Sequence, residues 1–165
     1  MTISILGIHA RSNYKLIPGL DLWDIDRDAY NFTGQNPVIV HPPCAQWSRM
    51  KAKAISNKDE KNLAEFCWEK VRDNGGIFEH PAGSSFFKYV NADFSKIISV
   101  SQRWWGFPAE KRTYLYFSRS SPLSTPLSFD CATKKVCQLH SSQRSLMPLS
   151  FCQYLVDCIQ KTHTS

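Results

Sequence analysis

The 165-residue sequence lacks any apolar run of about 18 residues, the length that a membrane-spanning helix needs. Its first residues lack the charged lead and the cleavage site of a signal peptide, so we expect a cytoplasmic protein with no membrane partner. The six cysteines do not form a tight disulfide framework, and we interpret them as reduced thiols. A zinc site of Cys131, Cys137 and His140 is a weaker interpretation, because the spacing is irregular.

Acidic residues are in the minority, with 14 Asp and Glu against 20 Lys and Arg, which gives a net charge of +6. This balance favours a polyanionic partner, and DNA or RNA is the first candidate, with solubility alone as the alternative. There is no long basic tail, internal repeat or low-complexity tract. The five tryptophans indicate packing first and base stacking second.

The hydrophobic pattern predicts both strands and helices. Short apolar or alternating runs predict strands over residues 3–8, 20–26, 37–41, 77–79, 96–101 and 112–117. Apolar residues at helical spacing predict helices over 57–73 and 149–161, and Gly75-Gly76 should end the first one. We therefore expect one three-layer α/β domain over residues 1–165. Its sheet should be mostly parallel and Rossmann-like, with about five strands.

Polar residues follow three of the predicted strands directly, namely Asp24 with Asp26, His41 to Cys44, and Glu79 with His80. Because sites in parallel sheets lie beyond the carboxyl ends of strands, we expect these residues to gather at one edge. Two prolines would hold the Cys44 thiol rigid, and positive charge from His41 and Arg49 would favour its thiolate. Glu79 is placed for general acid–base catalysis.

Three motifs resemble, in their order along the chain, the core of the cytosine-C5 DNA methyltransferases. Pro42-Pro43-Cys44, with Ser48 beyond it, resembles the nucleophile loop of that family. Glu79-His80 resembles its Glu-Asn-Val motif, with His80 where Asn is usual. Residues 102–116 resemble its Gln…Gly-Val-Pro-Gln…Arg-x-Arg stretch, although the Arg-x-Arg spacing is lost. The resemblance covers residues 37–117 and the final helix.

The resemblance implies a base-directed pocket. In that family the cysteine attacks C6 of a flipped base, and the glutamate pairs with the base edge and supports its protonation. The candidate catalytic residues are therefore Cys44, Glu79, His41 and His80. The candidate DNA-binding residues are Arg49, Gln102, Lys111 and Arg112. Trp104 and Trp105 are candidates for flanking a base, with packing as the alternative.

The sequence departs from the family at the cofactor end. The Phe-x-Gly loop that holds S-adenosylmethionine is reduced to Gly7, and the helix that follows it is missing. Asp24 and Asp26 resemble the acid that would hold the cofactor's ribose. Residues 118–135 form a predicted loop in place of the target-recognition domain. We therefore expect a shortened relative, of the kind found in small phage proteins, that does not bind S-adenosylmethionine. A phage origin would make the host cytoplasm its location.

A second chemistry fits the same strand ends. Carboxylates and imidazoles suit Mg²⁺ or Mn²⁺ and hydrolytic strand cleavage, and the candidate ligands are Asp24, Asp26, His41, Glu79 and His80. Our first hypothesis is an enzyme that processes DNA at a base, an abasic site or the adjoining phosphodiester. The alternatives are a reduced S-adenosylmethionine-dependent cytosine-C5 methyltransferase, and a non-catalytic protein that recruits or inhibits a host DNA-repair or modification enzyme.

Overall fold

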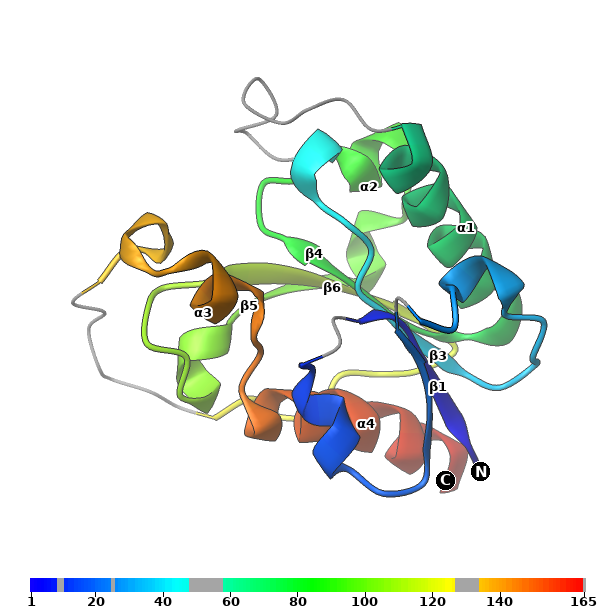
Figure 1. Ribbon diagram of the computed structural model, residues 1–165. Helices are drawn as coiled ribbons and strands as arrows, with labels where there is room; N and C mark the ends of the chain where they lie inside the picture. Colours follow the sequence, from blue (N-terminus) through cyan, green and yellow to red (C-terminus); the bar gives the residue numbers. More distant parts are fainter. Residues whose placement is uncertain (9–10, 25, 48–57, 127–133, 165) are drawn as a thin grey trace.

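The computed structural model describes residues 1–8, 11–24, 26–47, 58–126 and 134–164 (Figure 1). Within these ranges the chain is a single α/β domain with six strands in one sheet. The strands are β1 (Ile3–Ile8), β2 (Leu20–Asp24), β3 (Val38–Val40), β4 (Gly76–Pro81), β5 (Ile97–Ser101) and β6 (Arg112–Ser118). The α-helices are α1 (Lys58–Asn74), α2 (Phe86–Tyr89), α3 (Ser141–Ser145) and α4 (Leu149–Thr164). None of the described helices has the length and apolar character to cross a membrane.

The sheet is mixed, and the expectation of a mostly parallel sheet was wrong. Its strand order is β2-β1-β3-β4-β6-β5. The β1–β2, β1–β3 and β3–β4 pairs are parallel, whereas β6 is antiparallel to both β4 and β5. The cause lies in the connection between β5 and β6, which contains no α-helix. A parallel pair needs a crossover, usually helical, whereas a chain that turns back directly forms an antiparallel pair.

Hydrophobic residues fill both faces of the sheet, because successive side chains along a strand point to opposite faces. On one face Ile39 and Ile77 pack in the same cluster as Phe151, Leu155 and Ile159 of α4. On the other face, the same two strands pack against α1 and α2. This cluster contains Val38, Val40 and Phe78 of the strands, Cys67 and Val71 of α1, and Phe86 of α2. Figure 1 shows α4 on the opposite side of the sheet from α1 and α2.

The predicted elements agree closely with those observed. β1 has the predicted bounds, β2 stops at Asp24 instead of residue 26, and α1 begins at Lys58 and ends at Asn74. Gly75, with φ +80°, ends the helix in the left-handed conformation that glycine favours. Gly76 follows with φ +130°, and a Cβ there would lie 1.9 Å from the Val38 carbonyl oxygen. Only glycine fits the start of β4, so the link from α1 to β4 is specified by the sequence.

Candidate functional site

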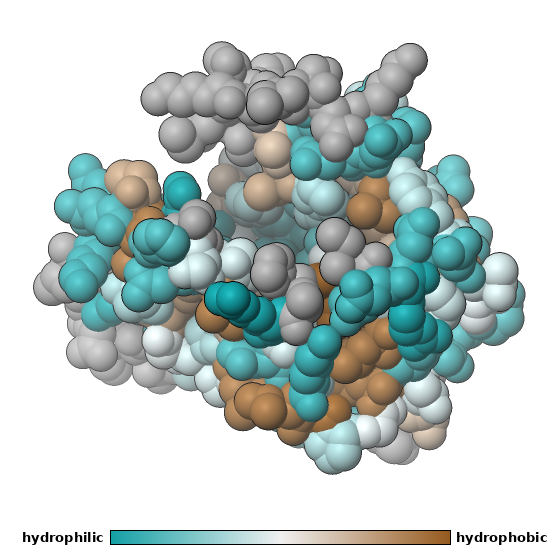
Figure 2. Space-filling model, in the orientation of Figure 1, coloured by the Kyte–Doolittle hydropathy of each residue, from teal (hydrophilic) through white to brown (hydrophobic). Residues whose placement is uncertain are grey.

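A cavity of about 660 Å³ lies beyond the carboxyl ends of β1, β3 and β4. Its wall contains the end of β1, residues 41–44 after β3, and Glu79 of β4. Arg11, Lys111, Ser142 and residues 144–147 complete it. The volume is within the range of about 300–1,000 Å³ typical of small-ligand sites. Figure 2 shows a hollow on this face of the molecule with hydrophilic residues inside it. The cavity is therefore the candidate active site.

His41 lies between two partners at the wall of this cavity. Its Nε2 is 3.0 Å from the Tyr14 hydroxyl oxygen, and its Nδ1 is 3.1 Å from Glu79 Oε2. An ionised carboxylate can only accept hydrogen bonds, so the ring donates from Nδ1 to Glu79, and the Tyr14 hydroxyl pairs with Nε2. Tyr14, in the 3-10 helix η1 (Asn13–Leu16), is fully buried, and burial raises the pKa of its hydroxyl well above the usual value. Tyr14 therefore keeps its proton, and its hydroxyl orients the imidazole through this hydrogen bond.

Glu79 is the buried carboxylate of the site, with 9% of its surface exposed. Burial by itself would raise its pKa. The hydrogen bond from His41, together with the electrostatic effects of His41 and Lys111, outweighs burial, and the pKa of Glu79 lies below its usual value. Gln102 Nε2 lies 3.5 Å from Glu79 Oε1 and donates to Thr113 Oγ1 at 3.1 Å. The cavity therefore contains an ionised, oriented carboxylate that can accept a proton from a ligand.

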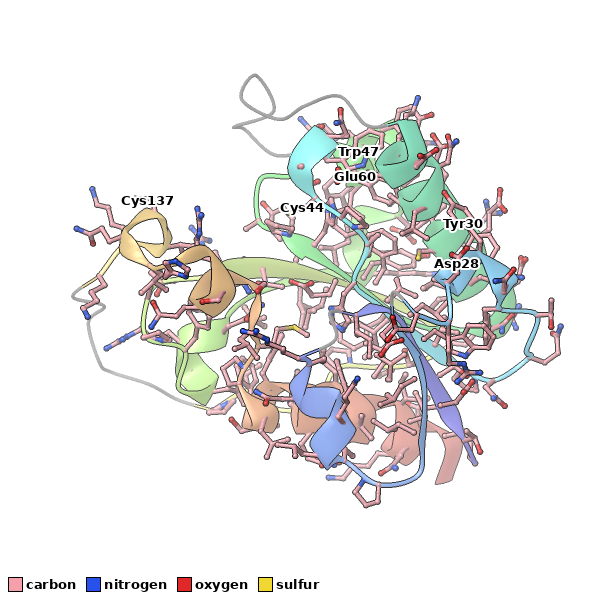
Figure 3. The ribbon with its side chains drawn as sticks, in the orientation of Figure 1. Asp28, Tyr30, Cys44, Trp47, Glu60 and Cys137 are labelled. Carbon is pink, nitrogen blue, oxygen red and sulfur yellow. The ribbon has the colours of Figure 1, made fainter. Side chains whose placement is uncertain are left out.

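Cys44 lines the cavity but is not set up as a thiolate. Burial raises the pKa of its thiol, and the negative charge of Glu79 raises it further, while the positive charge of Lys111 opposes both. A nucleophilic cysteine normally has a lowered pKa. The geometry thus keeps Cys44 in the cavity wall as a neutral thiol, and Figure 3 shows it on the segment that follows β3.

Lys111 is a basic side chain of the same wall. Its Nζ donates to the Arg144 carbonyl oxygen at 3.0 Å and lies 4.9 Å from the centroid of the Phe107 ring. Burial lowers the pKa of Lys111, although the negative charge of Glu79 acts in the opposite direction. Arg11 and Arg144 add two further basic side chains to the lining. A cavity with one carboxylate and three basic residues suits an anionic ligand that exchanges a proton.

His80 points away from the cavity, as strand alternation requires for the neighbour of Glu79. It is fully buried near Phe78, Phe86 and Phe87, and its Nδ1 lies 2.6 Å from Ser84 Oγ. Burial lowers the pKa of His80 to about 4, against the opposing effects of the Glu79 charge and the Pro43 backbone. His80 is therefore a neutral core residue that does not line the cavity.

The remaining predicted site residues are dispersed. Asp24 and Asp26 do not line the cavity, and Asp24 Oδ2 is 3.1 Å from Lys15 Nζ. Arg112 is exposed and also lies outside the lining. Trp105 packs on Phe151 and Tyr154 of α4, with centroid distances of 5.0 and 4.7 Å, so packing is its observed role, and Trp104 packs against the same core. Arg49 and Cys131 lie outside the described residues.

The described residues give little support to a metal site or to a site for S-adenosylmethionine. Across the described ranges no three His, Cys, Asp or Glu side chains come together as metal ligands, and of the five candidates only His41 and Glu79 meet. Cys137 lies far from Cys44 in Figure 3, and His140 Nδ1 is engaged by Ser142 Oγ at 2.8 Å. Asp24 and Asp26, the acids that would hold the ribose of S-adenosylmethionine, do not line this cavity, although Asp24 is aligned with Ile8 of its wall.

Sequence reasoning missed Arg11 and Arg144 as cavity residues, and it missed Tyr14 as the buried partner of His41. The segment before β2 showed only a polar stretch with a turn, and nothing in its pattern indicated that Tyr14 would be buried against His41. Arg144 reaches the site because α3 and the residues that follow it form part of the cavity wall, which no local signal predicts. Comparison with models of known protein families finds no match, and comparison with curated proteins finds no similar sequence.

Proposed function

We propose that the protein is an enzyme that processes DNA at a base, an abasic site or the adjoining phosphodiester, and that the cavity beside His41 and Glu79 is its active site. One observation carries this proposal. An ionised glutamate, oriented by a histidine, stands in a nucleotide-sized cavity whose wall also contains three basic side chains. Enzymes that act on a base or its sugar take the nucleotide out of the duplex into such a pocket.

The basic residues supply the affinity in this proposal. Arg11, Lys111 and Arg144 line one cavity in a protein of net charge +6. Lys and Arg side chains that neutralise phosphates provide most of the sequence-independent binding of DNA. In a cavity, the same residues hold the phosphates that flank an extruded nucleotide and position its base or sugar beside Glu79.

The chemistry of the site is proton transfer. Glu79 accepts a proton from the bound nucleotide or from an attacking water, and returns it to the leaving group. His41 holds the carboxylate through its Nδ1–H and is itself held by the Tyr14 hydroxyl. Gln102, in the 3-10 helix η6 (Gln102–Trp105) after β5, supports the second carboxylate oxygen. This arrangement fixes the Glu79 carboxylate, the general base, before the substrate enters, which is what general acid–base catalysis requires.

We also propose that the fold is a shortened, three-layer relative of the cytosine-C5 DNA methyltransferase core. The helices on both faces of the sheet support this, and so does the position of Cys44 and Glu79 in one cavity. Asp24 and Asp26 do not line the cavity, which supports the loss of methyl transfer rather than its retention.

The test is incubation of the protein with labelled duplexes that contain a normal, a uracil or an abasic site, with Mg²⁺ or with a chelator. We expect processing of at least one modified duplex, with the same rate in chelator. Processing only with Mg²⁺ would support the metal-dependent alternative. Methyl transfer from labelled S-adenosylmethionine would support the methyltransferase alternative. DNA binding with no product from any duplex would support the third alternative, a non-catalytic protein that recruits or inhibits a DNA-repair or modification enzyme.

A further inference from the structure

We propose that Lys111 is the nucleophile of the cavity, and that the substrate it attacks is an aldehyde, the open-chain deoxyribose of an abasic site. This inference rests on the proposed function and deepens it, because it selects one substrate class among three. The nucleophile expected from the sequence, Cys44, lies in the same wall as a neutral thiol. Lys111 contributes a primary amine to that wall, the kind of nucleophile that condenses with an aldehyde.

The backbone around Lys111 is held firmly. Its carbonyl oxygen accepts a hydrogen bond from the Gln102 amide at 3.0 Å, and the Thr113 hydroxyl lies 3.4 Å from the same oxygen. Gln102 is the residue that also contacts Glu79. Gln102 thus contacts both the backbone of Lys111 and the carboxylate of Glu79. This shared contact positions the amine and the carboxylate relative to each other in the cavity wall.

The amine of Lys111 has the surroundings of a reactive lysine. Among the described residues no carboxylate lies within 4.0 Å of it as an ion-pair partner. Its contacts are one carbonyl oxygen, from Arg144, and the face of the Phe107 ring. Burial disfavours the ammonium form and lowers the pKa, which raises the fraction of neutral amine near neutral pH. Lysines desolvated in this way are the ones that form Schiff bases with carbonyl substrates.

The reaction balances with the groups present in the cavity. The Nζ lone pair attacks C1′ of the aldehyde, and the resulting carbinolamine loses water to form a protonated imine. Glu79 removes a proton from C2′, and the electron pair of that C–H bond moves toward the imine. The C3′–O bond then breaks, the 3′ phosphate leaves, and a C2′–C3′ double bond remains. Water hydrolyses the imine and returns the amine of Lys111, so no oxidant or metal is consumed.

The test is reduction with borohydride during incubation with abasic duplex, which converts the imine to a stable amine. We expect a covalent protein–DNA adduct, mapped to Lys111 by mass spectrometry. Lys111→Arg keeps the positive charge and a donor for the Arg144 carbonyl but cannot form this adduct, so its yield should fall at least about 100-fold. Lys88→Ala, which removes an exposed lysine of α2, is the matched control and should leave the yield unchanged.

A second arm separates this inference from the proposed function. The same reduction is run with 2-deoxyribose 5-phosphate, an aldehyde that needs no DNA binding. An adduct at Lys111 with the small aldehyde but none with DNA would support the nucleophile and contradict a DNA substrate. DNA processing with no adduct, or with an adduct at another lysine in folded Lys111→Arg, would overturn the inference and leave the proposed function standing. Absence of any adduct from both probes would also overturn it.

Glu79→Gln tests the order of the steps. Imine formation precedes removal of the C2′ proton, so this variant should still form the reduced adduct but should release the 3′ phosphate at least about 100-fold more slowly. Equal loss of adduct and of strand cleavage in folded Glu79→Gln would contradict the removal of the C2′ proton by the carboxylate.

Discussion

His41 Nδ1 lies 3.1 Å from Glu79 Oε2, although 38 residues separate them in the chain. The register of the parallel β3–β4 pair brings them together, since Val40 is aligned with Phe78 and each candidate residue comes next. Side chains at matching positions of neighbouring strands point to the same face. The hydrogen bond is thus a direct consequence of strand pairing, and it places the carboxylate at the wall of the cavity.

Cys44→Ser should have little effect on DNA processing. Burial and the charge of Glu79 raise the pKa of the thiol, so the group is neutral at pH 7 and Ser has a similar size. We expect a single-turnover rate within about threefold of the wild type, since the variant loses no general acid or base. A loss of about 1,000-fold in a folded Cys44→Ser protein would instead establish cysteine as the nucleophile.

DNA affinity should fall steeply as the salt concentration rises, and Arg144 of the cavity wall should contribute to the slope of log K against log salt. Each phosphate neutralised by a basic residue contributes about −0.9 to the slope of log K against log salt. Arg144→Ala should therefore make the slope shallower by about 0.9, measured by fluorescence anisotropy at several salt concentrations. Arg72→Ala, at the exposed end of α1, is the control and should leave the slope unchanged. Identical slopes for all three proteins would remove the cavity from the DNA-binding surface.

Stability should decrease as the pH falls below about 6.5, because of His80. Its folded pKa of about 4 is below the ordinary value of 6.5, so the unfolded state takes up the proton first. The contribution of neutral His80 to the free energy of unfolding is complete above pH 6.5. It is lost as the pH falls towards 4, and below that pH it changes no further. A shift of this size corresponds to a loss on the order of 3 kcal/mol in the free energy of unfolding.

Urea unfolding at several pH values measures this effect. His80→Gln should flatten the dependence between pH 6.5 and 4, whereas His140→Gln, at an exposed histidine, should keep it. A pH dependence as steep in His80→Gln as in the wild type would show that other groups are responsible.

Local signals account for most of what the sequence predicted. Patterns within one element predicted strand 3–8 and the helix that Gly75 ends. A pattern between adjacent strands predicted that His41 and Glu79 would meet. The antiparallel position of β6 was not predicted, because strand direction depends on how a loop turns in space. Asp24 ends β2 at the predicted edge of the sheet, aligned with Ile8 of the cavity wall, but it does not line the cavity. β2 lies at the edge of the sheet, and Asp24 pairs with Lys15.

The same limit explains the missed residues. Tyr14 and Arg144 come from segments without a strong periodic pattern. Tyr14 meets His41 only when η1 packs behind it, and Arg144 reaches the cavity only when α3 packs over it. Such contacts depend on the complete tertiary structure. His80 shows the converse. Its residue type suggested catalysis or metal binding, but strand alternation directs it into the core beside Phe86.

The central claim is that the Glu79 carboxylate performs proton transfer on DNA, and one rate comparison tests it most directly. The single-turnover rate on the processed duplex is measured for the wild type, for Glu79→Gln, and for Glu69→Gln, which changes an exposed carboxylate of α1. We predict a loss of about 10²- to 10⁴-fold for Glu79→Gln, with DNA affinity retained, and no change for Glu69→Gln. Equal rates for Glu79→Gln and the wild type would contradict the account and place the chemistry elsewhere on the protein.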